Sequence, residues 1–109
     1  MDPNKPVRAC VHFDSPHSVA FRLFHEAPGG AETEMATGSS QHNPSCHSGG
    51  PFQAGTKIRW FFLIAGNPNT TYRMRVTLEQ DGEPVINQVP VRGTTAGDGT
   101  ANEVGEVTL

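Results

Sequence analysis

Apolar and polar residues alternate along the first part of the chain. Apolar residues occupy every second position over residues 7–13 and again over residues 19–23. The segment between them, residues 14–17, reads Asp-Ser-Pro-His, which is typical of a turn. Alternation with a period of two is typical of half-buried strands, because successive side chains point to opposite faces of a sheet. The pattern therefore predicts two strands joined by a short turn.

The second half of the chain returns to strand-like patterns. From Trp60 onward, residues 57–65 are apolar on both faces, which indicates a central strand. Residues 72–79 then alternate without interruption, and they form the clearest strand pattern in the sequence. Asp81-Gly82 follows at once, and Asp-Gly is a strong signal for a two-residue hairpin turn. We therefore expect residues 84–91 to pair with the preceding strand.

A two-residue turn fixes the register of this hairpin. The predicted pairs are Leu78–Val85, Val76–Asn87, Met74–Val89 and Tyr72–Val91. Pro84 and Pro90 then fall at pairs that do not exchange hydrogen bonds, so their missing N–H groups face away from the 72–79 strand. A further strand on that side would lack two donors. Residues 84–91 are therefore predicted to form an edge strand.

The last residues are predicted to form a loop and a short strand. Residues 93–100 are rich in Gly and Thr and are expected to be flexible. Residues 102–109 contain apolar positions whose alternation is imperfect, which suggests a β-bulge near Gly105.

Residues 26–56 differ in composition from the rest of the chain. Gly, Ser, Pro, His and Asn dominate this region, and it is predicted to be one long polar loop. One helical turn is expected over residues 31–37. Long loops in compact domains are commonly functional, so this region is the first place to look for a binding surface.

Length and composition place these elements in one class of fold. The 109 residues indicate a single domain over residues 1–109, and 12 Gly with 9 Pro disfavour a helical bundle. About six to seven strands predict a small antiparallel β-sandwich, with a small β-barrel as the alternative. In general architecture the predicted sandwich resembles immunoglobulin and fibronectin domains. However, no cysteine pair brackets Trp60 in the antibody pattern, so no family is assigned.

The two cysteines are candidates for a disulfide. Cys10 and Cys46 are the only cysteines, and an even number in a small Gly-rich domain fits one bridge in an oxidising compartment. Such a bridge would contribute roughly 3.8 kcal/mol according to the chain-entropy argument. Two reduced thiols, or two thiols that share a metal, are the alternatives.

Histidines near Cys46 raise the possibility of a metal site. The candidate ligands are His12, His42, Cys46 and His47. Cysteine and histidine suit zinc or copper(I), but this spacing matches no established pattern. The sequence also lacks a G-x-S-x-G elbow, an H-E-x-x-H helix and a phosphate-binding loop. We therefore expect no cofactor and no enzymatic activity, and we keep a Cys/His metal-binding protein as the alternative function.

A basic and aromatic stripe supplies the candidate ligand-binding residues. Arg59 and Phe61 share one face of their predicted strand, and Arg73 and Arg75 share one face of the next. If the two strands are neighbours, these side chains form one surface that suits an acidic protein, a sugar or single-stranded nucleic acid. Nucleic acid is disfavoured, because the net charge is −3 and the chain has only eight Lys and Arg.

These observations predict a non-enzymatic binding module for a protein or glycan partner. The expected surfaces are the loops at 26–56 and 93–101 and the edge strand at 84–91. No apolar run is long enough for a membrane-spanning helix. We expect a secreted or periplasmic protein whose signal peptide is absent from this sequence, and a cytoplasmic protein is the alternative.

Overall fold

Nine strands and no helix make up the computed structural model, which describes residues 1–109. The strands are β1 (Val7–Phe13), β2 (Ser18–Glu26), β3 (Thr33–Ser39), β4 (Ser45–Gly49), β5 (Lys57–Ala65), β6 (Thr71–Gln80), β7 (Glu83–Pro84), β8 (Val89–Thr94) and β9 (Thr100–Thr108). The structure contains no helix with the length and apolarity needed to cross a membrane.

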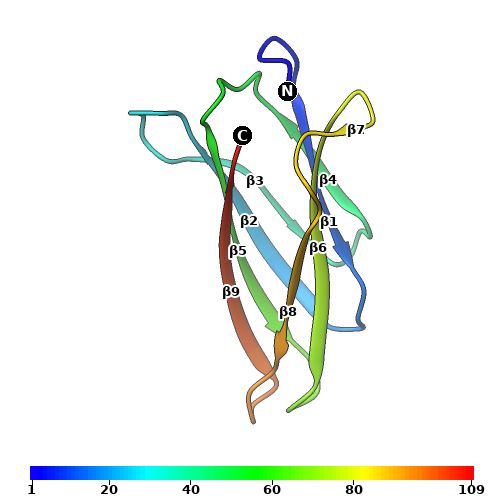
Figure 1. Ribbon diagram of the computed structural model, residues 1–109. Helices are drawn as coiled ribbons and strands as arrows, with labels where there is room; N and C mark the ends of the chain where they lie inside the picture. Colours follow the sequence, from blue (N-terminus) through cyan, green and yellow to red (C-terminus); the bar gives the residue numbers. More distant parts are fainter.

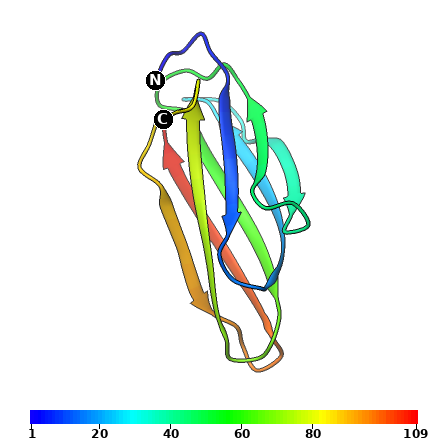
Figure 2. The same cartoon turned by 90° about the vertical axis from the view of Figure 1, so that its right-hand side faces the viewer.

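The strands form two antiparallel sheets packed face to face (Figure 1). In the first sheet β1 lies between β4 and β6, and β6 pairs on its other side with β7 and β8. Figure 2 shows β8, β6, β1 and β4 side by side across this sheet. The second sheet has the order β3-β2-β5-β9. The β-sandwich prediction is thus confirmed, and the alternative of a closed barrel is wrong.

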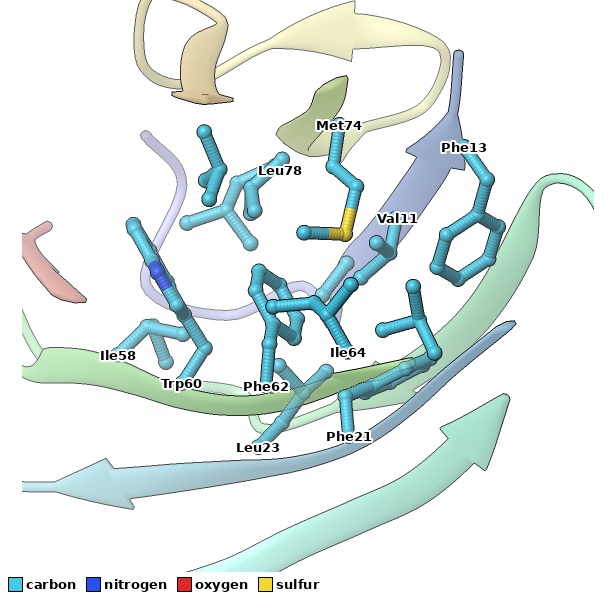
Figure 3. Packing of buried hydrophobic residues seen from close by; sticks show 14 of the residues in the cluster. Val11, Phe13, Phe21, Leu23, Ile58, Trp60, Phe62, Ile64, Met74 and Leu78 are labelled. Atoms are coloured by element: carbon cyan, nitrogen blue, oxygen red, sulfur yellow. The ribbon is translucent and has the colours of Figure 1, made fainter. Parts of the chain in front are cut away.

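The core lies between the two sheets and follows from the alternating patterns. Trp60, Phe62 and Ile64 of β5 point inward, and they meet Val11 and Met74 from the first sheet (Figure 3). One cluster of 17 buried hydrophobic residues fills this space. β5 also carries apolar residues on its outward face, which explains why its sequence reads as apolar on both sides.

The prediction of one long loop over residues 26–56 is wrong, because this region contains two strands. β3 pairs with β2 at one edge of the second sheet, and β4 pairs with β1 at one edge of the first. β3 also covers most of the segment 31–37, where a helical turn was expected. Both are edge strands, and most of their residues are only partly buried. Ser, Thr and Gly are therefore tolerated there, and no alternation of apolar residues marks these strands in the sequence.

The hairpin after β6 begins in the predicted register and then shifts by two residues. Gln80 faces Glu83 as predicted, but Val76 faces Val89 instead of Asn87. The two additional residues lie within 85–88, between β7 and β8. Because side chains alternate with a period of two, this shift leaves the apolar faces matched. β8 pairs only with β6, so the prediction of an edge strand is confirmed.

The final strand is regular, and the predicted bulge near Gly105 is wrong. The pairing of β9 with β5 runs without a break from Lys57 opposite Thr108 to Ala65 opposite Thr100. Gly105 is required by packing, because a Cβ atom there would lie 2.5 Å from Nε1 of Trp60. The imperfect alternation arises because Glu103 faces inward, where its carboxylate accepts a hydrogen bond from the Tyr72 hydroxyl.

Candidate binding site on the outward face of the first sheet

The predicted disulfide is present and joins two neighbouring strands of the first sheet. Cys10 of β1 lies directly opposite Cys46 of β4, with a Cα–Cα distance of 4.1 Å. Ala9 and Val11, on either side of Cys10, belong to the core cluster, whereas Cys10 points to the outward face. The bridge therefore attaches an edge strand to its sheet. It does not cross the core, as the disulfide of an antibody domain does.

The structure does not bring the four candidate metal ligands together. Cys46 is bonded to Cys10, and the ring of His47 packs edge-on against Phe21, with the ring centroids 5.9 Å apart. His12 lies on the outward face, with Nε2 3.2 Å from Oγ1 of Thr77. His42 lies in the exposed turn before β4. No three His, Cys, Asp or Glu side chains are arranged to hold a metal ion.

The predicted basic and aromatic stripe is split between the two sheets. Arg59 and Phe61 lie on β5 of the second sheet, whereas Arg73 and Arg75 lie on β6 of the first. β5 and β6 follow one another in sequence but are not paired, because the chain crosses from one sheet to the other between them. The expectation that these four residues form one surface is therefore wrong.

The positive charge of Arg59 is also balanced by neighbouring carboxylates. Its guanidinium group contacts the carboxylates of Glu26, Glu32 and Glu106, the last at 2.8 Å. The hydrogen bond to Glu106 and the nearby negative charges raise the pKa of Arg59. These contacts leave Arg59 little capacity for another anion.

The structure instead brings together three arginines on the first sheet. Arg73 of β6 lies directly opposite Arg92 of β8, and Arg75 is the next outward residue along β6. Five of the eight Lys and Arg side chains make ion pairs, and they are Lys5, Arg8, Arg22, Arg59 and Arg75. Arg73 and Arg92 make none. Two unpaired cations therefore face each other across one pair of strands.

Arg75 is held in place by the turn before β2. Its Nε lies 2.8 Å from Oδ2 of Asp14 and its Nη2 lies 3.1 Å from Oδ1, a two-point contact. This hydrogen bonding by Arg75 lowers the pKa of the Asp14 carboxyl, which stays ionised. Burial and the positive charge of Arg75 lower the pKa of the neighbouring His12, which favours its neutral form. The orientation of Arg75 is thus fixed, whereas Arg73 and Arg92 keep their donors free.

A shallow hollow of about 450 Å³ lies over these residues. Asp14, Gln88 and Pro90 line it together with the three arginines, and no aromatic side chain takes part. Guanidinium groups donate two parallel hydrogen bonds to a carboxylate, phosphate or sulfate group. The hollow, which we call the arginine site, is therefore suited to binding an anion.

Arg92 is the functional candidate that the sequence patterns missed. In the predicted register Arg73 faces Pro90, and Arg92 lies beyond the end of the hairpin. The shift of two residues between β7 and β8 moves Arg92 opposite Arg73. Its only signal in the sequence is that Arg92, like Arg73, lies on the polar side of an alternating segment.

A second hollow, of about 500 Å³, lies on the outward face of the second sheet. Leu63, Ala65 and Ala20 line it together with Ser, Thr, Asn and Gln side chains. It contains no titratable group. It therefore offers apolar contact area and no acid–base chemistry.

No family model, no curated protein and no solved structure matches this chain.

Proposed function

We propose that the protein is a non-enzymatic binding module that recognises an acidic segment of a protein partner at the arginine site. The observation that carries the proposal is the unpaired cross-strand pair of Arg73 and Arg92. Like charges directly opposite each other destabilise a sheet. An anion placed between them would remove that repulsion and satisfy their free donors.

The chemistry of the site favours a protein partner over a glycan. A sugar ring stacks its C–H face on aromatic side chains, and none lines this hollow. Carboxylates of Asp and Glu match the guanidinium groups in charge and in geometry. Pro90 lacks the N–H that strand addition needs, so recognition here uses side chains and not added backbone pairing.

The disulfide supports a location in an oxidising compartment. Disulfides persist in secreted and periplasmic proteins and are rare in the cytosol. The proposal is therefore a secreted or periplasmic module in which the sandwich holds the arginines in a fixed arrangement.

Binding of a fluorescently labelled oligoglutamate peptide, followed by anisotropy at low and moderate salt, tests this proposal. We expect Arg73→Gln and Arg92→Gln each to weaken binding about tenfold or more, because each removes charge-assisted hydrogen bonds. Lys57→Gln is the matched control, because it removes an exposed cation from the second sheet without touching the site. It should leave the affinity unchanged.

A second measurement separates binding from stability. Arg92→Gln should raise the free energy of unfolding by roughly 0.2–1 kcal/mol, because it removes a like-charge pair. Three results would overturn the proposal: no binding of the peptide, equal weakening by Lys57→Gln, or loss of stability in Arg92→Gln. Tighter binding of a sulfated oligosaccharide, lost in the same arginine variants, would replace the protein partner with an acidic glycan.

A further inference from the structure

Of the four edge strands of the sandwich, only β9 is long, regular and free of proline. β3 has an irregular register opposite Leu23 and Phe24, β4 is only five residues long, and β8 contains Pro90. Interruptions, short length and proline are the usual means by which proteins prevent edge-to-edge pairing. β9 is nine residues long, contains no proline and keeps one continuous register. It is therefore the edge best suited to accept another strand.

The hydrogen bonds at the two ends of β9 show which of its backbone groups point to its free edge. Leu109 N–H donates to the carbonyl of Thr56, and the carbonyl of Gly99 accepts from Gly66 N–H, both at 2.8 Å. Bonding direction alternates along an antiparallel strand, so the odd-numbered residues of β9 bond to β5. The even-numbered residues Thr100, Asn102, Val104, Glu106 and Thr108 therefore direct their N–H and C=O groups away from the sheet. Those of Thr100 are already bonded to Asp98 and Ala96, so the free groups belong to the other four residues. The side chains of these same residues are exposed.

The sequence of β9 is complementary to itself in one register. When two antiparallel copies are centred on Val104, each Val104 faces its equivalent, Asn102 faces Glu106 of the second copy, and Thr100 faces Thr108. No like charges meet in this register. Because the backbone of Thr100 is already bonded, about six new backbone hydrogen bonds would form, two for each of the three pairs made by Asn102, Val104 and Glu106.

The neighbouring registers are worse. Moving the centre to Glu103 places the two Glu103 carboxylates opposite each other, which is destabilising. Moving it to Gly105 places Val104 against Glu106 and leaves the apolar side chain without an apolar partner. Charge repulsion in one neighbouring register and loss of apolar contact in the other therefore favour the register centred on Val104.

The outward face of the second sheet extends this complementarity. Val104 is 64% exposed and lies opposite Phe61, and Leu63, two residues along β5, is 50% exposed. These are the two most exposed large hydrophobic side chains of the chain. Pairing about Val104 would join the two Phe61–Val104 pairs into one apolar stripe across both copies, which removes apolar area from water.

We propose that two copies of this chain associate through β9, antiparallel and centred on Val104, to form one continuous eight-stranded sheet from the two second sheets. This contact lies on a different sheet from the arginine site. Each dimer would therefore carry two arginine sites, and the proposal does not depend on what they bind.

Sedimentation velocity over a concentration series tests the association. The unmodified protein should shift from monomer to dimer as its concentration rises. Val104→Lys should abolish the shift, because it places two lysines opposite each other at the centre. Thr37→Lys makes the same change at an exposed position of the edge strand β3, and it should leave the dimer intact.

A cross-linking experiment fixes the register. Val104→Cys places two thiols at a hydrogen-bonded pair, where the Cα atoms are about 5.5 Å apart and within reach of a disulfide. Under mild oxidation we expect a covalent dimer from Val104→Cys and none above background from Thr37→Cys. A monomer at every concentration, a dimer that persists in Val104→Lys, or equal cross-linking of the two cysteine variants would each overturn the proposal.

Discussion

The two sheets share one core but present outward faces of different chemistry. The first sheet carries a disulfide, three clustered arginines and edges that are short or contain proline. The second sheet has no covalent link, exposes Leu63 and Val104, and ends in the regular edge strand β9. The first face is suited to an anionic ligand held by side chains. The second is suited to pairing through backbone groups and apolar contact.

The difference also concerns what stabilises each sheet. β4 contributes Ser45 to the buried interior but no residue to the apolar core cluster, and the bridge to Cys10 holds it against β1. β9 is held by nine residue pairs with β5, and Gly105 lets it approach Trp60 closely. The edge strand β4 is thus held by a covalent bond, whereas the edge strand β9 is held by backbone pairing and close packing.

The largest effect is expected from removing the disulfide of the first sheet. In the double variant Cys10→Ser with Cys46→Ser, the free energy of unfolding should fall by about 4 kcal/mol, because the unfolded chain regains the freedom of a loop that spans 36 residues. Urea unfolding of the oxidised protein and of the variant measures this difference. Reductant should destabilise the unmodified protein and leave the variant unchanged. An unaltered unfolding midpoint would show that the bridge contributes nothing.

A smaller loss is expected from filling the close contact in the second sheet. In Gly105→Ala the new Cβ would lie 2.5–2.6 Å from three atoms of the Trp60 ring, so the ring or the strand must move. Overpacking of this kind costs about 1–3 kcal/mol. Thermal unfolding measures the loss, and Gly97→Ala is the control, because a Cβ there meets no atom within 4 Å. Equal stability of the two variants would contradict the packing role of Gly105.

The smallest effect concerns the hydrogen bond that links the two sheets. Tyr72 of β6 donates to Glu103 of β9, and burial followed by this bond raises the pKa of Tyr72 to about 12 from an ordinary value of 10.0. A raised pKa means that the hydroxyl contributes stability that is complete below pH 10 and is lost as the pH rises towards 12. Tyr72→Phe should cost about 1 kcal/mol at neutral pH.

Titration of tyrosinate absorbance measures this pKa directly, because Tyr72 is the only tyrosine in the chain. The midpoint should lie near 12. Glu103→Gln should lower it, because the negative charge and the hydrogen bond of Glu103 both raise it. A midpoint near 10 in the unmodified protein would contradict the link between the sheets.

The strands that line the core were predictable from their residues. Of the edge strands, β8 and β9 were predicted and β3 and β4 were not. Alternation identified β1, β2 and β6, and a run that is apolar on both faces identified β5, because each of these strands must cover its inward face with apolar side chains. β3 and β4 were not predicted, because edge strands whose residues are mostly only partly buried tolerate Ser, Thr and Gly. The same exposure made residues 26–56 resemble a loop.

The candidate sites were less predictable than the fold. The cysteine count favoured a Cys10–Cys46 disulfide over two reduced thiols or a shared metal, and the structure shows the bridge. The grouping of Arg59 with Arg73 failed, because neighbouring strands in the sequence belong to different sheets of a sandwich. The position of Arg92 opposite Arg73 depends on a shift of two residues between β7 and β8, and a shift of this size leaves the hydrophobic pattern unchanged.

Local chemistry was thus readable along the chain: which residues alternate, where the chain turns, and that two cysteines are present to pair. These properties depend on near neighbours in the sequence. Other properties depend on contacts between residues that are distant in the sequence. These properties are the order of the strands in each sheet, the absence of ion pairs at Arg73 and Arg92, and the free edge of β9. An alternating pattern shows only which side chains of a strand share a face. Which sheet the strand joins, and which residues lie opposite it, are decided when the whole core packs.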